Sequence, residues 1–308
     1  MLKIKLTERA DIQILVVGLG LAGKKLQIES TGAQIDTATL LTTLTTMGAT
    51  GEVDEVIKSP SKSNRLIVFT GLGKIESNFS PELLRRAAGA ASRNLLGNEG
   101  ASFALPHKSV AEIAAIAEGA ALGSYSFTEF RGSTKVGQKS PLSSITIVTR
   151  FANTAQAKSA IKRAEIIAEQ TFLVRDLVNT PPSSLTPDSF CLRAKKLASK
   201  YGVKVEVLNE AALRKGGYGG IIGVGQGSVN PPRLLHLSYS PAKAKKRFAF
   251  VGKGITFDTG GLALKPANGM EAMKADMSGA AAVVAAIFAI AQLKLPIAID
   301  AWAPLAEN

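Results

Sequence analysis

The chain has 308 residues, of which 46% are hydrophobic and 20% are charged, and this length and balance predict a globular protein with one large or two ordinary domains. Its single cysteine, Cys191, excludes an internal disulfide and a cysteine-based zinc cluster, so oxygen and nitrogen atoms must hold any metal. The net charge is +13, but the Lys and Arg residues stand in short scattered groups without interleaved aromatic residues, which favours an ordinary solvated surface over a nucleic-acid face.

The first half of the chain alternates short apolar runs with helical patterns, which is typical of an α/β unit. The apolar run at 14–17 is too short for the hydrophobic region of a signal peptide, so we expect no export signal and a cytoplasmic protein. Residues 131–141 carry glycine, serine and charge without periodicity, and we place a domain boundary near residue 150, between domains over 1–150 and 151–308. The pattern predicts strands at 12–17, 66–70, 102–105 and 145–148 and helices at 81–96 and 110–122.

The second half again has the pattern of an α/β unit, built around buried strands. A long helical pattern over 154–178 ends before Pro181 and Pro182, because two prolines cannot continue a helix. The most apolar stretch, 280–291, is shorter than the about 18 residues that a membrane span needs, and we expect a buried helix there. The other expected elements are a helix at 187–201, strands at 203–208, 234–239 and 248–251, and a glycine-rich segment at 216–227.

Residues 18–25 (GLGLAGKK) follow the first strand and match G-x-G-x-x-G, and they nearly match the phosphate-binding pattern G-x-x-x-x-G-K-[ST]. A phosphate loop needs a hydroxyl after the lysine to hold Mg²⁺, but that position is Lys25. No amphipathic helix begins there, because the segment that follows is short and ends at Gly32. These departures favour a glycine turn. The alternative, a non-catalytic nucleotide- or nucleic-acid-binding protein that uses residues 18–25 and the basic surface, stays open.

Four ionisable residues stand out where a buried strand runs into glycine-rich backbone and then into the apolar helix. Lys253, Asp258, Lys265 and Asp276 can gather at the carboxyl end of the strand, where open α/β sheets place their binding crevices. Two carboxylates and two lysines beside an apolar helix are costly to bury unless they are paired or bound to a metal. Asp276 also precedes the helix, where the helix dipole stabilises a carboxylate.

Charge alone leaves two interpretations of these four residues. In one, Lys253 pairs with Asp258 and Lys265 pairs with Asp276 as ordinary loop salt bridges, and Asp276 caps the helix. In the other, the four residues form a functional site with a bound metal.

This stretch resembles the leucine aminopeptidase (cytosol aminopeptidase) family. Its sequence VGKGITFDTGG, followed by a lysine and by MEAMKADMSGAA, is similar to the family pattern, with Thr259 in place of the usual serine. Residues 174–187 (VRDLVNTPPSSLTP) and 219–232 (GGIIGVGQGSVNPP) also resemble the family, and weaker similarity extends through the first half. The resemblance implies an α/β protein with a smaller N-terminal α/β domain and an incomplete C-terminal α/β/α catalytic domain with a central mixed sheet.

The resemblance gives each of the four residues an expected role. Asp258 matches a carboxylate that bridges two divalent metal ions, and Lys253 and Asp276 match further ligands of the more tightly bound ion. Lys265 matches the catalytic lysine, which stabilises the oxyanion formed when an activated water attacks the peptide carbonyl. Ligands of this kind suit Zn²⁺, Mn²⁺, Mg²⁺ or Co²⁺ and do not choose among them.

The resemblance also implies an activity and a part of the site that this sequence does not contain. The family's second motif, N-T-D-A-E-G-R, supplies an aspartate, a glutamate and an arginine to the site, and it does not occur before the last residue, Asn308. We therefore expect the 308-residue chain to be inactive or nearly so. For the intact protein we expect hydrolysis of N-terminal residues from peptides and a homohexamer, with neither membrane nor nucleic acid as a partner. His107 and His236 match no site residue.

Overall fold

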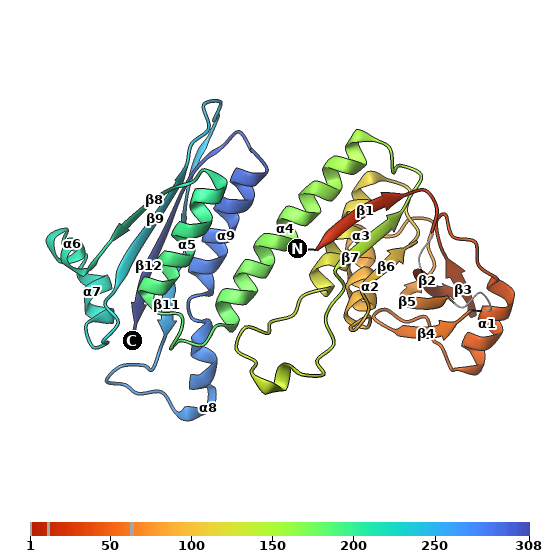
Figure 1. Cartoon of the computed structure of the whole chain (residues 1–308), viewed down its shortest axis with the longest axis horizontal. Coiled ribbons are helices and arrows are strands. Elements are labelled where there is room, and N and C mark those ends of the chain that lie inside the picture. Colours follow the sequence, from red (N-terminus) through yellow and green to blue (C-terminus); the bar gives the residue numbers. More distant parts are fainter. Residues whose placement is uncertain (1, 11–12, 62–64) are drawn as a thin grey trace. The chain divides into compact units, whose positions relative to one another are not determined.

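The chain forms two compact units, and one long helix belongs to both. The computed structural model describes residues 2–10, 13–61 and 65–308, and its two units are Met1–Ala168 and Glu169–Asn308 (Figure 1). The division lies inside α4 (Ala155–Asn179), later than the boundary expected near residue 150. In the first unit Glu165 Oε1 of α4 accepts a hydrogen bond from the Ile4 amide (3.3 Å), whereas Leu177 of α4 belongs to the core of the second. Because the boundary between the units lies inside one continuous helix, the sequence has no Gly-, Pro- or Ser-rich linker at that position.

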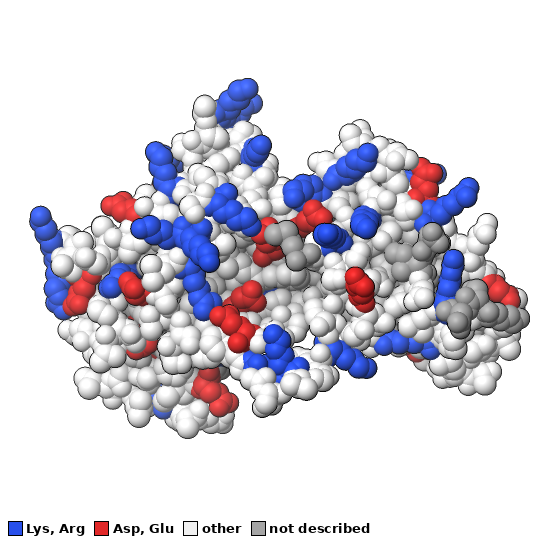
Figure 2. Space-filling view, viewed as in Figure 1, with Lys and Arg blue, Asp and Glu red and all other residues white. Residues whose placement is uncertain are grey.

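Basic and acidic side chains are mixed on the face of the molecule that Figure 2 draws. On the face drawn in Figure 2, Lys and Arg side chains are spread over both units, with Asp and Glu side chains among them. Some of these charges are paired, as in the contacts of Arg85 with Glu118 (3.0 Å) and of Lys200 with Glu169 (3.1 Å). The net charge of +13 therefore does not form one continuous basic track on that face.

The first unit is a seven-stranded mixed sheet with helices packed on it. The strand order is β1-β7-β6-β2-β5-β4, with β3 paired to β2. Strands β1, β7, β6, β2 and β5 are parallel, and β3 and β4 are antiparallel to their neighbours. The α/β architecture predicted for the first half is confirmed. The elements are β1 (Lys3–Thr7), β2 (Ile14–Ala22), β3 (Lys25–Glu29), α1 (Thr37–Thr46), β4 (Val56–Pro60), β5 (Leu66–Lys74), α2 (Pro81–Arg93), β6 (Gly100–Phe103), α3 (Val110–Gly123), η1 (Ser133–Lys135) and β7 (Ser144–Val148).

The glycine-rich segment 18–25 forms a β-hairpin. Residues 18–22 continue β2, and Gly23, at a φ of +65°, turns the chain into the antiparallel strand β3. Gly20 permits close packing with the neighbouring strand β5, because a Cβ there would lie 2.5 Å from the Gly73 carbonyl oxygen. The predicted glycine turn is confirmed. A strand occupies the place where a phosphate loop requires a helix N-terminus, so this segment lacks the structural context of a phosphate site.

The second unit is a five-stranded mixed sheet in the order β10-β12-β9-β8, with β11 paired to β12. Strands β10 and β11 run parallel to β12, whereas β9 is antiparallel to β12 and β8 is antiparallel to β9. The mixed sheet expected for the second half is confirmed. The elements are α5 (Pro187–Tyr201), β8 (Lys204–Leu208), α6 (Glu210–Lys215), α7 (Gly219–Gly225), β9 (Arg233–Tyr239), β10 (Arg247–Val251), β11 (Gly254–Phe257), α8 (Ala267–Met270), η2 (Glu271–Ala275), α9 (Ser278–Gln292) and β12 (Ala298–Glu307).

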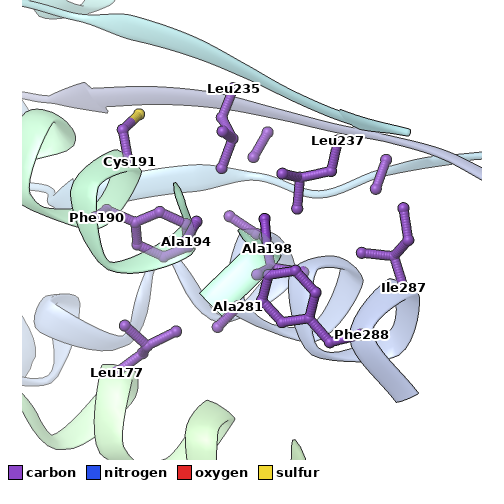
Figure 3. Packing of buried hydrophobic residues seen from close by; sticks show 14 of the residues in the cluster. Leu177, Phe190, Cys191, Ala194, Ala198, Leu235, Leu237, Ala281, Ile287 and Phe288 are labelled. Atoms are coloured by element: carbon purple, nitrogen blue, oxygen red, sulfur yellow. The ribbon is translucent and has the colours of Figure 1, made fainter. Parts of the chain in front are cut away.

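The core of the second unit lies where α5 and α9 pack on the sheet (Figure 3). Phe288 of α9 is fully buried, and its ring lies 5.3 Å from that of Tyr201 on α5. Leu235 and Leu237 of β9 both face this core, because residues two positions apart on a strand point to the same side of the sheet. Burial raises the pKa of the Cys191 thiol to about 12, so this cysteine is a core residue without nucleophilic reactivity at neutral pH.

The apolar helix expected at 280–291 is α9, a core helix. Among the residues that the structure describes, the run 267–292 is long and apolar enough to cross a membrane by length and composition. That run is not one helix, because Asn268 and Gly269 have non-helical backbone angles and η2 separates α8 from α9. Helix α9 itself has 15 residues, fewer than the about 18 of a membrane span, and it contributes much of the core.

Candidate metal centre

The four ionisable residues singled out in the sequence lie at one edge of the second sheet. Lys253 stands between β10 and β11, Asp258 follows β11, and Lys265 lies in the loop that leads to α8. Asp276 ends η2, just before α9. Because β10 and β11 both run parallel to β12, their carboxyl ends meet at the same edge of the sheet.

The lysines and aspartates form two close contacts, but not in the combination of the salt-bridge interpretation. Lys253 Nζ lies 2.8 Å from Asp276 Oδ2, and Lys265 Nζ lies 2.8 Å from Asp258 Oδ2. The pairing of Lys253 with Asp258 and of Lys265 with Asp276 in that interpretation was wrong. Lys253 instead pairs with Asp276, and Lys265 pairs with Asp258.

The loop between Asp258 and Lys265 turns back on itself, and two glycines in the left-handed region make the turn. Gly260 and Gly261 have φ of +91° and +63°, which a residue with a side chain adopts only with strain. The Lys265 N–H donates to the Thr259 carbonyl oxygen (2.8 Å) and closes the loop. This turn returns the Lys265 ammonium to Asp258.

The Asp258 carboxylate is held by three donors. Its Oδ2 accepts a hydrogen bond from Lys265 Nζ (2.8 Å), and its Oδ1 accepts from the Gly260 N–H (2.9 Å) and from Asn308 Nδ2 (2.9 Å). The pKa of Asp258 is lowered, chiefly by the hydrogen bond from Lys265 and further by those from Gly260 and Asn308, although burial opposes this shift. The carboxylate is therefore ionised at neutral pH and carries a full negative charge into the site.

Asp276 is not the cap of α9, contrary to the expectation from its position. Met277 occupies the N-cap position, and no side chain caps the helix. Asp276 Oδ2 is buried and makes no hydrogen bond among the described residues, but it lies 2.8 Å from the Lys253 ammonium. In this structure the Lys253 ammonium is the cation that neutralises this buried oxygen, and a metal ion bound there would take over that role.

Close backbone packing brings Asp276 to Lys253. A Cβ on Gly252 would lie 2.2 Å from the Gly279 carbonyl oxygen, so only glycine permits this approach of the strand end to the start of α9. The Ala280 N–H then donates to the Lys253 carbonyl oxygen (2.8 Å). The first turn of α9 is thereby fixed to the end of β10, and Asp276, just before it, lies next to the Lys253 side chain.

An open cleft of about 520 Å³ adjoins the site. Lys253, Asp258 and Asn308 line it, and α7 contributes Ile221 and Val224. The cleft therefore combines a charged part with an apolar wall, which is the usual composition of a site that binds a partly apolar ligand.

The donor set is that of a partial metal site. Among the residues that the structure describes, no group of three or more His, Cys, Asp or Glu side chains is placed to hold a metal ion. Asp258 and Asp276 offer carboxylate oxygens, and the Lys253 amine can add a nitrogen ligand in its neutral form. Two carboxylates and an amine suit a divalent cation of the Mg²⁺, Mn²⁺ or Zn²⁺ type.

Asn308 is a residue of this site that sequence reasoning missed. It follows β12, and its side chain reaches Asp258 across 50 positions of sequence. The available signal was a polar residue directly after β12, because β12 and β11 are parallel and their carboxyl ends therefore lie at the same edge of the sheet.

The two histidines make structural contacts. In the first unit His107 bonds a backbone carbonyl and the Thr149 hydroxyl (both 2.9 Å), and burial lowers its pKa. In the second unit His236 stacks on Trp302 (3.8 Å between rings) and bonds Asp300 (2.9 Å). These contacts hold both imidazole rings in place within their units.

Both units have counterparts in one protein family. Residues 172–308 match the catalytic domain of the cytosol aminopeptidase family, and residues 16–134 match the N-terminal domain of the same family. The catalytic-domain match includes all four of the residues gathered at the sheet edge and Asn308.

Proteins named probable cytosol aminopeptidase are similar over nearly the whole chain. The one from Streptomyces coelicolor is 45% identical, with 97% of this chain and 62% of that protein aligned. The one from Rhodococcus erythropolis is 44% identical, with 96% of this chain and 60% of that protein aligned. The chain thus spans about three fifths of the length of these relatives.

Solved structures show the same architecture. The bottromycin maturation enzyme BotP, in complex with Mn, matches with a TM-score of 0.79 and 34% identity, over 96% of this chain and 60% of that one. The cytosol aminopeptidase from Coxiella burnetii matches with a TM-score of 0.74 and 23% identity, over 99% of this chain and 61% of that one, and this likeness concerns the fold.

Proposed function

The chain belongs to the cytosol aminopeptidase family, and from this premise we propose that it contributes Lys253, Asp258, Lys265 and Asp276 to the active site of a two-metal aminopeptidase that removes N-terminal residues from peptides. The observation that carries the proposal is the gathering of these residues at the carboxyl edge of the sheet in two lysine–aspartate contacts of 2.8 Å each. The chain spans 62% of the length of its Streptomyces coelicolor relative. The activity is therefore proposed for a protein that contains these residues and not for the 308 residues alone.

Asp258, Asp276 and Lys253 are the proposed metal-holding residues. Two divalent ions, of which Mn²⁺ and Zn²⁺ are the leading candidates, would supply Lewis-acid activation of a water molecule and of the substrate carbonyl. Asp258 is ionised and faces the cleft region, and Asp276 Oδ2 is buried without a hydrogen-bond donor. The Mn carried by BotP, which is 34% identical, supports manganese as one of the ions.

Lys265 is the proposed electrophile. Its ammonium is held at Asp258 Oδ2 and is half-buried, so it lies beside a carboxylate that lines the cleft. An ammonium in this position stabilises the negative charge that develops on the carbonyl oxygen as water attacks, and a preorganised donor of this kind is usually a large part of catalysis. In the metal-free protein its contact with Asp258 holds the ammonium at the site.

The substrate class, assembly and compartment follow from the family and belong to the proposal. The apolar wall that α7 lends to the cleft favours peptides with an apolar N-terminal residue, as in leucyl peptides. A homohexamer is typical of the family, and the relatives' names favour the cytoplasm. The expectation that these 308 residues alone are inactive or nearly so stays a prediction.

Replacement of Lys265 tests the proposed function. In the intact protein with Mn²⁺, we expect Lys265→Ala to lower kcat for leucine amide hydrolysis by about 100-fold to 1000-fold, the usual cost of losing one oxyanion donor. Mn²⁺ affinity should not fall, because Lys265 is not a proposed ligand and its ammonium occupies the Asp258 Oδ2 that the ion would use. Lys215→Ala, at an exposed lysine of α6, is the matched control and should keep full activity. Hydrolysis by Lys265→Ala at the wild-type rate would refute the role, and a metal-loaded wild type without hydrolysis would refute the function.

A further inference from the structure

The backbone of Asn308 brackets Asp258. The Asn308 N–H donates to the carbonyl oxygen of Phe257 (3.0 Å), and the Asn308 carbonyl oxygen accepts from the N–H of Thr259 (2.8 Å). These two bonds extend the parallel pairing of β11 with β12, in which Phe257 lies opposite Glu307. The residue on each side of Asp258 is therefore bonded to Asn308, and the Asp258 backbone has little freedom.

The side chain of Asn308 adds a third bond, to the carboxylate itself. Asn308 Nδ2 lies 2.9 Å from Asp258 Oδ1, and the Gly260 N–H reaches the same oxygen at 2.9 Å. An ionised carboxylate only accepts hydrogen bonds, so it is the amide nitrogen of Asn308 that must face it. The two carboxylate oxygens thus have different partners. Oδ1 accepts from the Gly260 backbone N–H and from the short Asn308 side chain, whereas Oδ2 accepts from the long, flexible Lys265 side chain.

The space around the Asn308 carboxamide is limited by Gly261. A Cβ built on Gly261 would lie 3.1 Å from Asn308 Oδ1, and Gly261 already has a φ of +63°. Glycine therefore leaves room for the carboxamide and a larger residue would press on it. The side chain lies between this glycine and Asp258, which favours one orientation of the amide.

We propose that Asn308 is a positioning residue of the metal centre, which fixes Asp258 through Oδ1 and leaves Oδ2 as the oxygen presented to the metal ion. The inference rests on the proposed function, because it assigns a metal to Asp258. Lys265 is the displaceable partner of Oδ2, and Asn308 with Gly260 is the permanent partner of Oδ1. The carboxylate plane therefore keeps its orientation when Lys265 releases Oδ2.

Asn308→Leu tests the inference, because leucine has nearly the shape of asparagine and no donor. In the 308-residue protein titrated with Mn²⁺ and followed by electron paramagnetic resonance, we expect Mn²⁺ affinity to fall about 10-fold to 100-fold, the usual cost of removing a residue that orients a metal ligand. In the metal-free protein we expect the Gly260 amide to exchange its hydrogen about fivefold faster, since its acceptor is held less firmly. The matched control is Asn230→Leu, which removes an asparagine–carboxylate bond of 3.0 Å to Glu307 and should change neither quantity.

The two measurements separate the inference from the proposed function. If wild type binds no Mn²⁺, the metal assignment fails, and unchanged Gly260 exchange in Asn308→Leu would then overturn the positioning as well. Wild-type Mn²⁺ affinity in Asn308→Leu overturns the role of Asn308 at the metal, whatever the exchange rate. If Asn308→Leu does not fold, Asn308→Ala takes its place, because alanine also lacks a side-chain donor and keeps the backbone bonds, and the same two results are expected.

Discussion

Asp258→Asn is expected to weaken Mn²⁺ binding by about 100-fold or more, which exceeds the about 10-fold to 100-fold cost of losing a residue that only orients a ligand. The substitution keeps the shape of the side chain but removes its negative charge and one of its acceptor oxygens. The lost charge matters most, because Asp258 is ionised at neutral pH and each donor around it points at the carboxylate. Isothermal titration of the metal-free protein with Mn²⁺ measures the effect.

The control for Asp258→Asn is Asp188→Asn. Asp188 lies in the same unit and pairs with Arg233 (3.1 Å), so its replacement also breaks an aspartate–cation contact. We expect Mn²⁺ affinity in Asp188→Asn to equal that of wild type. Equal affinities in Asp258→Asn and wild type would show that the metal is held elsewhere.

Phe288→Ala is expected to cost about 3–5 kcal/mol in the free energy of unfolding of the second unit, as large-to-small changes at fully buried aromatic residues do. Phe288 is 0% exposed and packs against Tyr201 and the sheet core, so its loss leaves a cavity that rigid neighbours on two helices and a strand cannot fill. Since α9 also fixes the end of β10 through Ala280, loosening this helix should displace Asp276 from Lys253.

Urea unfolding followed by tryptophan fluorescence measures the cost of Phe288→Ala. Trp302 is the single tryptophan of the chain and lies on β12, so its signal reports the second unit. Val229→Ala is the control, because Val229 is 93% exposed and its truncation should change the free energy of unfolding by no more than about 0.5 kcal/mol. A loss below about 1 kcal/mol in Phe288→Ala would contradict the packing described for α9.

Sequence patterning predicted the elements that carry strong signals. The helices α2, α3, α4, α5 and α9 and the strands β2, β5, β6, β7, β8, β9 and β10 were all expected close to where they occur. Most of the elements that patterning missed are short or polar, and the exception is the ten-residue strand β12. Helix α1 (TATLLTTLTT) is rich in threonine, which disfavours a helix, and its N-cap Asp36 was the remaining signal. Strand β4 ends at Pro60, and β3 exists because it pairs with β2.

The candidate site could be predicted as a set of residues but not as a set of contacts. Lys253, Asp258, Lys265 and Asp276 were found because a buried strand, glycines and an apolar helix surround them in sequence. Their pairing was wrong because it depends on the turn at Gly260 and on the approach of α9 to β10, which no local pattern encodes. Asn308 was missed for a related reason, since its contacts arise from the pairing of two parallel strands.

The central claim is that Asp258 and Asp276, with Lys253, hold a divalent metal ion at the carboxyl edge of the second sheet. Crystals soaked in Mn²⁺ and measured at a wavelength with strong manganese anomalous scattering test it most directly. We predict an anomalous peak with carboxylate oxygens of Asp258 and Asp276 at about 2.0–2.3 Å, the range of bonds from oxygen to such ions. A well-ordered site with no peak, or a peak bound by other residues, would contradict the account.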